Sequence, residues 1–201
     1  MTESRRIVLA TRNGDKVREI LKIIQNPEYD FVSLLDFEHI PDIIESGNTL
    51  KENAFIKART AYRYTGLPCI ADDTGLEVDA LDGAPGVHSS RFAGENCEYR
   101  DNNEKLLRLM QDVPDEKRTA RFRCVVALVH DQGEHWTEGI CEGKILIAYR
   151  GQGGFGYDPL FFIPRFGKTF AELELDIKNQ ISHRGQAFRK MAEYIEQAKS
   201  V

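Results

Sequence analysis

Cysteine is scarce in this sequence, and long apolar runs are missing. The four cysteines are far apart and form no C-x-x-C pair, which argues against a disulfide framework or a zinc site. The apolar run Ile7–Ala10 is too short for the core of a signal peptide, and no segment reaches the length of a transmembrane helix. We therefore expect a cytoplasmic protein with no membrane partner.

The sequence also has no long run of charges of one sign. Its formal net charge is -5, which argues against a nucleic acid polymer as a partner, because phosphate backbones require clustered Lys and Arg. A small polyanion is still possible, since a few local cations can hold one triphosphate. With 41% hydrophobic and 29% charged residues, the 201 residues suit a single globular domain, 1–201.

Hydrophobic periodicity predicts helices and strands in both halves of the chain. Strands are expected over 6–10, 31–34, 67–71, 121–129, 136–140, 144–148 and 160–163, and helices over 17–24, 49–64, 98–110 and 186–198. This mixture indicates an α/β fold, and the adjacent strands near 121–148 indicate a mixed central sheet flanked by helices.

The first candidate for chemistry is the turn from Thr11 to Lys16, between a strand and a helix. The N-terminus of a helix has unsatisfied N–H groups and a partial positive charge, which suit a phosphate. Thr11, Asn13 and Lys16 add polar and charged side chains. The alternative is that Asn13 simply caps the helix.

The second candidate is the acidic pair Asp72-Asp73 together with Glu45. The pair follows an apolar strand, at the edge where α/β folds bind ligands. Carboxylates crowded together need a neutralising cation, and oxygen ligands point to Mg²⁺. The alternative is a turn, because Asp-Asp-Thr-Gly is also good turn chemistry.

The third candidate is Lys57, which lies four residues after Asn53 on the predicted helix, at the edge of its inner stripe of alanines. Its ammonium could reach a buried anion. The alternative is a lysine that packs its stem on the helix and extends its charge into water.

The fourth candidate is the glycine-rich segment 151–156. It has the spacing G-x-G-x-x-G, but the residues after it resemble a turn and a strand rather than the helix of a dinucleotide-binding motif. Its glycines would allow close approach to a flat ligand, with Phe155 or Tyr157 stacking on a base. The alternative is a flexible hairpin.

The fifth candidate is Ser182-His183-Arg184-Gly185, which follows Lys178. Side chains of these types at the start of a helix can hydrogen-bond the edge of a base or a phosphate. By itself the motif is weak, because exposed His and Arg are common near helix ends.

Together these segments resemble the inosine/xanthosine triphosphate pyrophosphatase family, over nearly the whole chain and in the order of the family. The matching motifs are Thr11-x-Asn13-x-x-Lys16-x-x-Glu19, Glu45-x-Gly47-x-Thr49-x-x-Glu52-Asn53-Ala54, Lys57-Ala58, Ala71-Asp72-Asp73-x-Gly75-Leu76, Gly83-Ala-Pro-Gly86, Ser90-Arg91, Gly153-Gly-Phe-Gly-Tyr-Asp-Pro159 and Ser182-His-Arg-Gly185. Each motif is weak alone, but the ordered set is specific.

The resemblance implies a fold of two lobes with the nucleotide in the cleft between them, and a homodimer. It implies Mg²⁺-dependent cleavage between the α and β phosphates of ITP, dITP or XTP. Asp73 would be the general base and a metal ligand, with Glu45 and Asp72 as the other metal ligands. The substrate-binding residues would be Thr11, Arg12, Asn13, Lys16 and Lys57 for the phosphates, Thr74 nearby, and Phe155, Gly156, Tyr157, Asp158, Lys178, His183 and Arg184 for the base.

The sequence departs from the family at three positions. Arg12 replaces a glycine, Thr74 replaces the serine of many bacterial members, and His88 stands where tyrosine is common. Two other functions compete with this interpretation: a pyrophosphatase for modified or pyrimidine nucleotides, and a regulator that binds a nucleotide without hydrolysing it. The three carboxylates argue against the regulator, because binding alone has little use for them.

Overall fold

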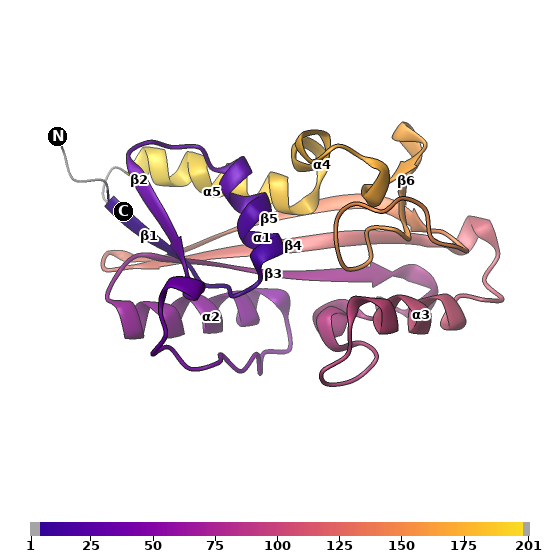
Figure 1. The fold of residues 1–201 in the computed structure, drawn as a ribbon, viewed down its shortest axis with the longest axis horizontal. Helices are drawn as coiled ribbons and strands as arrows, with labels where there is room; N and C mark the ends of the chain where they lie inside the picture. Colours follow the sequence, from indigo (N-terminus) through magenta and orange to yellow (C-terminus); the bar gives the residue numbers. More distant parts are fainter. Residues whose placement is uncertain (1–4, 199–201) are drawn as a thin grey trace. The chain divides into compact units, whose positions relative to one another are not determined.

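A computed structural model describes residues 5–198 of the chain, so both ends of the predicted domain 1–201 lie outside the described residues. Its strands and α-helices are shown in Figure 1. They are β1 (Arg5–Leu9), α1 (Gly14–Ile23), β2 (Tyr29–Ser33), α2 (Leu50–Thr65), β3 (Cys69–Val78), α3 (Tyr99–Leu109), β4 (Thr119–His130), β5 (Gly133–Ile145), β6 (Phe161–Ile163), β7 (Lys168–Thr169), α4 (Leu175–Ile181) and α5 (His183–Ala198).

The strands form one open seven-stranded sheet in the order β2-β1-β3-β4-β5-β6-β7. β1 is parallel to β2 and to β3, whereas β6 is antiparallel to β5 and to β7. The predicted mixed sheet with flanking helices is therefore confirmed. By its internal contacts the chain divides into two compact units, and the nucleotide cleft between lobes stays a prediction.

Unit 1 consists of residues 1–73, 124–139 and 184–201. In it, α1 and α5 cover one face of the strands and α2 lies on the other face (Figure 1). The core on the α1 and α5 face is formed by aliphatic and aromatic side chains, among them Ile7, Ile20, Val126 and Phe188. On the opposite face, α2 buries a stripe of alanines, which allows the helix to approach the sheet closely.

Unit 2 consists of residues 74–123 and 140–183. Its core joins side chains from α3, β3, β4, β5 and β6, and includes Leu76, Leu106, Phe122 and Phe161.

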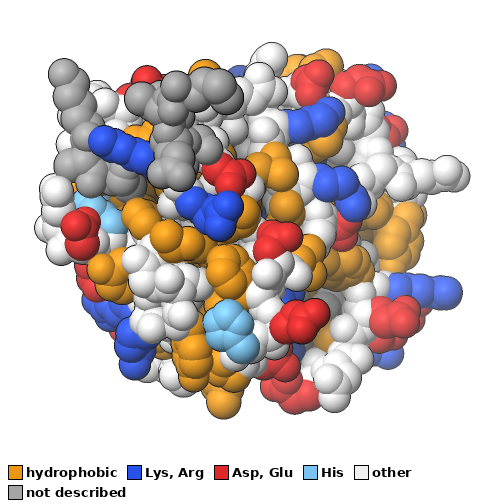
Figure 2. All heavy atoms as spheres, turned by 60° about the vertical axis from the view of Figure 1, so that its left-hand side comes forward, with side chains coloured by type: hydrophobic (Ala, Val, Ile, Leu, Met, Phe, Trp, Pro, Cys, Tyr) orange, Lys and Arg blue, Asp and Glu red, His pale blue; other side chains and the backbone are white. Residues whose placement is uncertain are grey.

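Among residues 5–198, none of the helices combines the length and the apolar character that a membrane-spanning helix needs. On the face drawn in Figure 2, basic and acidic side chains are interspersed with apolar ones, so neither sign of charge gathers in one patch there.

Several predicted boundaries were wrong. β3 was expected to end at residue 71, with Asp72 and Asp73 just after its C-terminal end, but it continues to Val78 because Leu76 and Val78 are buried in unit 2. The segments 136–140 and 144–148 belong largely to one strand, β5, which ends at Ile145. Helix α5 begins three residues earlier than expected, and α4 and β7 were not predicted.

The start of α2 was predicted correctly. The hydroxyl of Thr49 accepts a hydrogen bond from the N–H of Glu52 at 3.1 Å, as in a capping box. The carboxylate of Glu52 accepts from the N–H of Asn48 at 2.6 Å, one residue before the expected partner. The helix ends at Gly66, whose φ of 66° places it in the left-handed region that glycine adopts without strain. These capping contacts fix the first and last residues of α2, and Lys57 lies in the middle of the helix that they define.

Arg118 is a buried cation that organises one end of unit 2. Its side chain is 1% exposed, and its guanidinium donates to four backbone carbonyls, those of Met110, Val113, Ile145 and Leu146, at 2.6–3.1 Å. These bonds tie the C-terminal end of α3 to the start of β4 and the end of β5. Because all five guanidinium N–H groups lie in one plane, no other side chain could satisfy this set of acceptors.

We predict that Arg118→Leu lowers the free energy of unfolding by roughly 2–4 kcal/mol, because it leaves buried carbonyls without donors. Urea denaturation followed by circular dichroism would measure the change. The control is Lys117→Leu, an exposed neighbour for which we expect a change within about 0.5 kcal/mol. Equal effects of the two substitutions would contradict the role given to Arg118.

Candidate functional site

Asp72 and Asp73 are adjacent residues in the middle of β3 and are both buried, at 3% and 6% exposed. Because successive side chains of a strand point to opposite faces of a sheet, the two carboxylates face different helices. Asp73 meets Lys57 of α2, and Asp72 meets Lys16 of α1. The turn that was the alternative for this motif is therefore wrong, and so is the idea that the two carboxylates crowd each other.

On the α2 face, Lys57 lies between two carboxylates. Its ammonium donates to Asp73 Oδ1 at 2.8 Å and to Glu45 Oε1 at 3.0 Å. Burial lowers the pKa of Lys57, but the charges of Asp73 and Glu45 outweigh burial and raise it to about 12. The ammonium is therefore buried and charged, and the alternative of a lysine extending into water is wrong.

Asp73 is itself poised differently from an ordinary aspartate. Burial has the largest effect on Asp73 and raises its pKa. The charge of Lys57 lowers the pKa, and the repulsion from Glu45 raises it again, so the pKa of Asp73 lies above its ordinary value of 3.8. Its Oδ1 accepts from Lys57, whereas its Oδ2 is buried and has no hydrogen-bond partner among residues 5–198. An unsatisfied carboxylate oxygen is costly, so this atom suits a metal ion, a water or a proton to be accepted.

On the opposite face of β3, Asp72 is surrounded by cations. Lys16 Nζ lies 3.0 Å from Asp72 Oδ2, and Arg184 donates to the same oxygen at 3.3 Å. Burial raises the pKa of Asp72, but Lys16 and Arg184 more than reverse this effect and hold it well below its usual value. The carboxylate thus stays charged.

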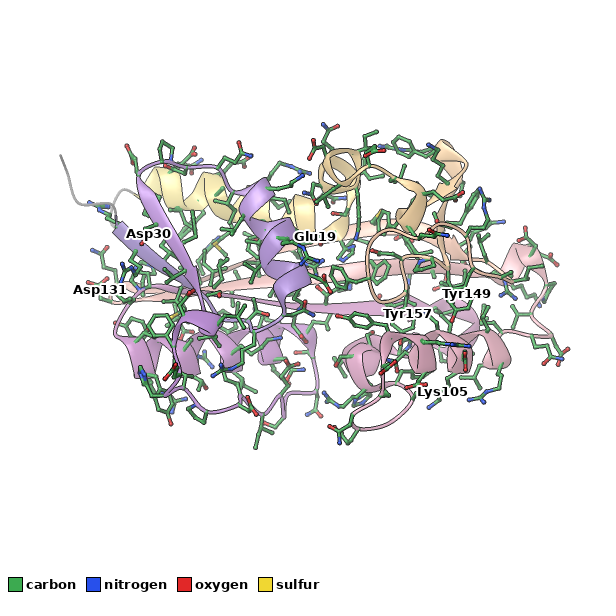
Figure 3. All side chains as sticks on the ribbon, viewed as in Figure 1. Glu19, Asp30, Lys105, Asp131, Tyr149 and Tyr157 are labelled. Carbon is green, nitrogen blue, oxygen red and sulfur yellow. The ribbon has the colours of Figure 1, made fainter. Side chains whose placement is uncertain are left out.

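Arg184 has a second partner on this face, Glu19 of α1 (Figure 3), whose Oε2 accepts from Arg184 Nη1 at 2.6 Å. Both side chains are buried, and the two carboxylates raise the pKa of Arg184 further above its usual value against the effect of burial. Glu19 ends the first of the motifs that match the family, but it was not among the predicted site residues. Its position three residues after Lys16, on the same face of a helix, was the signal that could have identified it.

The N-terminus of α1 is capped by the chain itself. Asn13 Oδ1 accepts from the N–H groups of Asp15 at 2.9 Å and Lys16 at 3.2 Å, so the capping alternative holds for Asn13. Thr11 Oγ1 accepts from the N–H of Asn13 at 3.1 Å. Arg12 donates to the carbonyls of Leu34 and Ile40, so it braces the following loop. Phosphate binding by Thr11, Arg12, Asn13 and Lys16 stays a prediction.

The residues predicted to bind the base gather in unit 2. Lys178 Nζ donates to Asp158 Oδ2 at 2.5 Å, and both side chains are buried. The same oxygen accepts from the N–H of Phe155 at 2.9 Å, and Lys178 lies 5.1 Å from the centre of the Phe155 ring. Phe155, Asp158 and Lys178 therefore form one cluster.

Of the two aromatic candidates, Phe155 is the more accessible. Tyr157 (Figure 3) is 5% exposed, packs in the core of unit 2 and donates its hydroxyl to the carbonyl of Ser89 at 2.9 Å. Burial raises the pKa of this hydroxyl above its usual value. Stacking on a base therefore favours Phe155.

His183 and Arg184 are adjacent but have different surroundings. The imidazole of His183 stacks on Phe122 in unit 2, with ring centres 4.6 Å apart. Arg184 bonds Asp72 and Glu19 in unit 1. The structure thus separates the two side chains that the motif suggested as a pair. Thr74 follows Asp73 in β3 and is half-buried.

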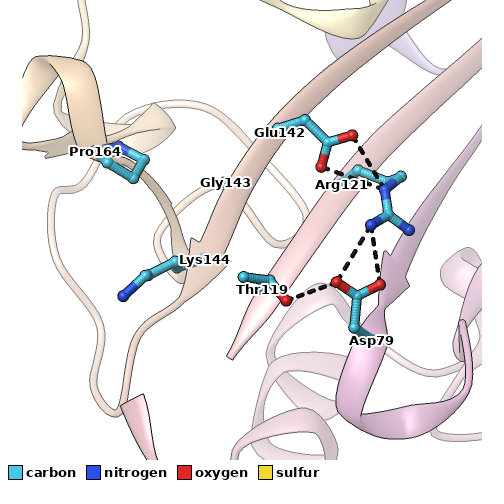
Figure 4. A pocket seen from close by; sticks show the side chains of 7 residues that line it. All are labelled: Asp79, Thr119, Arg121, Glu142, Gly143, Lys144 and Pro164. Atoms are coloured by element: carbon cyan, nitrogen blue, oxygen red, sulfur yellow. Dashed lines mark hydrogen bonds and ion pairs between the residues drawn. The ribbon is translucent and has the colours of Figure 1, made fainter. Parts of the chain in front are cut away.

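A pocket of about 350 Å³ lies elsewhere in unit 2 (Figure 4). It is lined by Asp79, Thr119, Arg121, Glu142, Gly143, Lys144 and Pro164. Arg121 pairs with Glu142 at 3.2 Å and with Asp79 at 2.9 Å across it, so these charges satisfy one another. None of the predicted site residues lines this pocket.

The carboxylates can be tested for their fit to a metal ion. Among residues 5–198, no three His, Cys, Asp or Glu side chains are grouped so as to enclose a metal. Mg²⁺ does not require such a cage, since it commonly binds one or two carboxylates together with water and substrate phosphates. Asp73, with its unsatisfied Oδ2, and Glu45, which shares Lys57 with it, fit that pattern.

Known proteins resemble the chain over almost its whole length. The model of the Ham1 family matches residues 7–194. A dITP/XTP pyrophosphatase of Desulforamulus reducens is 50% identical over 94% of this chain and 95% of its own length. A dITP/XTP pyrophosphatase of Vibrio cholerae is 48% identical over 98% of this chain and 99% of its own length. The structure of a HAM1 protein from Coxiella burnetii, 42% identical, covers 96% of this chain and 99% of its own, with a TM-score of 0.87.

The buried charges around Asp72 generate a prediction about stability and pH. Since the pKa of Asp72 is lower in the folded state than its ordinary value of 3.8, its stabilising effect is fully present above that value and is lost as pH falls below it. We expect Asp72→Asn to lower the free energy of unfolding by roughly 3–5 kcal/mol at pH 7, because the buried Arg184 and the half-buried Lys16 lose a charged partner.

The difference between Asp72→Asn and wild type should be constant from about pH 6 to 8 and shrink below about pH 4. Urea denaturation at a series of pH values, in metal-free buffer, would measure it. Glu104→Gln, which breaks the exposed pair with Arg100, serves as the control and should cost less than about 1 kcal/mol. A difference that grows on acidification would contradict the account.

Proposed function

Because the chain belongs to the Ham1 family, we infer that it is a nucleoside triphosphate pyrophosphatase that hydrolyses non-canonical purine nucleotides. The substrates would be ITP, dITP and XTP, and the products the nucleoside monophosphate and pyrophosphate, which removes these nucleotides from the pool. The support is a set of relatives named dITP/XTP pyrophosphatase that are about half identical over nearly their full lengths. The observation that carries the chemistry is the buried Lys57 between Asp73 and Glu45.

Asp73 acts as the general base. Its Oδ1 is fixed by Lys57, which leaves Oδ2 to accept a proton from an attacking water. Burial raises the pKa of Asp73 above that of an ordinary aspartate, which strengthens it as a proton acceptor. Lys57, held in place by two carboxylates, also provides a fixed positive charge where negative charge develops on the phosphates.

We propose Mg²⁺ as the cofactor, bound by Glu45 and Asp73. Asp72, the third metal ligand that the resemblance implies, pairs instead with Lys16 and Arg184 on the other face of β3. When bound, the ion would neutralise the charge of the triphosphate. Lys16 pairs with Asp72 at 3.0 Å and is 18% exposed at its side chain, so it could also meet a phosphate oxygen. Thr11, Arg12 and Asn13 would complete the phosphate site at the start of α1.

The base would be recognised by the cluster around Lys178. Lys178 supplies N–H donors to the 6-oxo group, and Asp158 holds its ammonium in place. An adenine base would present an amino group to those donors and leave them unpaired, which is the kind of mismatch that gives strong discrimination. Phe155 would stack on the base, and Gly156, Tyr157 and His183 would shape the site. Arg184, which the resemblance also assigns to the base, bonds Asp72 and Glu19 in unit 1.

We further propose that the protein is cytoplasmic and acts as a homodimer, as the family resemblance suggests. Light scattering coupled to size-exclusion chromatography would determine the mass in solution. A second copy is not required for any contact described above, so the activity and the oligomeric state can be tested separately.

The first experiment measures pyrophosphate release from dITP, XTP, dGTP, dATP and dUTP, with Mg²⁺ and with EDTA. We expect release from dITP and XTP to exceed that from dATP by at least about 100-fold in kcat/KM, because adenine lacks the 6-oxo acceptor, and EDTA to abolish release. Guanine carries the same 6-oxo group, so dGTP measures whether another feature of the base is also read. Release from dUTP alone would favour the pyrimidine alternative. Binding of dITP without release from any nucleotide would favour the regulator.

A second experiment tests whether Asp73 is the general base. We expect Asp73→Asn to keep the fold and to reduce kcat for dITP by about 10²–10⁴-fold, because the proton acceptor is removed. The matched control is Asp131→Asn, an exposed aspartate of unit 1, which should retain activity within about twofold. An Asp73→Asn enzyme with near-normal kcat would show that another group accepts the proton.

A further inference from the structure

Helix α3 makes two contacts to the segment that carries Phe155. Asn103, which is 3% exposed, donates from Nδ2 to the carbonyl of Gly156 at 2.9 Å. Tyr99, one helical turn earlier on the same face, lies with its ring 5.9 Å from the ring of Phe155. One side chain of the helix therefore holds the backbone next to Phe155, and the other contacts its ring.

This segment needs such contacts because its backbone is intrinsically free. Gly154 and Gly156 flank Phe155, and both adopt positive φ, at 70° and 61°. Glycine loses more conformational entropy on ordering than any other residue, so a loop of this composition orders only where neighbours fix it. Asp158 fixes the N–H of Phe155 and Asn103 fixes the carbonyl of Gly156, so the peptide is held on both sides of the ring.

The orientation of the Asn103 amide is set by its partner, since only the NH₂ group can donate to a carbonyl. Its Oδ1 is then buried without a hydrogen-bond partner among residues 5–198. A buried acceptor with no donor destabilises the folded state. Asn103 is therefore a poor residue for stability alone, which suggests that the position serves the loop instead.

We propose that Asn103 is a positioning residue that determines base selectivity. By fixing the carbonyl of Gly156, in the peptide that follows Phe155, it sets the distance between the ring that stacks on the base and the Lys178–Asp158 pair that reads the edge of the base. The proposal rests on the function inferred above and deepens it, because it adds α3 to the elements that define which purine is accepted.

The test compares Asn103→Leu with Asn102→Leu. Leucine keeps the branching of asparagine and removes its polar atoms. Asn102 is the neighbouring residue of the same helix and is equally buried, but its amide bonds Ala93 N–H at 2.7 Å and the Ser90 carbonyl at 3.1 Å. Both variants thus remove a buried amide from α3, but Asn103→Leu releases the carbonyl of Gly156, whereas Asn102→Leu releases the segment 90–93.

We expect Asn103→Leu to raise KM for dITP and to narrow the dITP-to-dATP ratio of kcat/KM by about tenfold, the loss typical of one hydrogen bond that positions a group. Its kcat for dITP should stay within about twofold of wild type, since Lys57 and Asp73 are unchanged, and its Tm should stay close to wild type. Asn102→Leu should lower Tm and leave the selectivity ratio unchanged.

A ratio within about twofold of wild type in Asn103→Leu would overturn the proposal, as would an equal narrowing in Asn102→Leu. Hydrogen exchange gives a second readout that needs no activity. Asn103→Leu should speed exchange of the amides at 155–158, whereas Asn102→Leu should not, and unchanged exchange in Asn103→Leu would also overturn it. If wild type releases no pyrophosphate from dITP or XTP, the proposed function fails by itself, and the exchange experiment still decides whether Asn103 holds the loop.

Discussion

The alternation of side chains along β3 is the constraint on which the rest of unit 1 depends. Two consecutive aspartates in a buried strand must face opposite sides of the sheet, so each needs its own counter-charge. Lys57 on α2 supplies one, and Lys16 on α1 with Arg184 on α5 supplies the other. The helices on both faces are thus tied to adjacent residues of one strand.

The two faces have different electrostatic character, although both carry an aspartate. Asp72 has two cationic neighbours, and its pKa is lowered, so it remains a fixed negative charge that organises the cluster. Asp73 shares one lysine with Glu45, its pKa is raised, and one of its oxygens is unsatisfied. Buried ion pairs are weak contributors to stability when whole and costly when broken. A site built this way is rigid, and the Asp73 face is the one left able to react.

Much of the fold could be predicted from the sequence, because its signals are local. Apolar periodicity located α1, α2, α3 and β1, and the Thr49 cap located the start of α2 within one residue. The end of β3 was missed because Asp-Asp-Thr-Gly satisfies the local rules for a turn, and only burial of Leu76 and Val78 in unit 2 overrides them. Long-range packing cannot be seen in a tetrapeptide.

The site residues, like the fold, could be predicted where the signal is local and not where it depends on long-range packing. Sequence patterns identified Glu45, Lys57 and Asp73, which the structure brings together. They did not separate His183 from Arg184, because adjacency along the chain says nothing about which face of a helix start each side chain takes. Asn103 could not be found at all from the sequence, since its role depends on a loop 53 residues away.

The most direct test of this account is a crystal structure with Mn²⁺ and a non-hydrolysable dITP analogue, in which anomalous scattering locates the metal. We predict a peak on the α2 face of β3, next to the carboxylates of Asp73 and Glu45 and the phosphates of the analogue. A metal bound to Asp72 on the opposite face, or one that does not contact Asp73, would contradict the central claim that the Asp73 face is the reactive one.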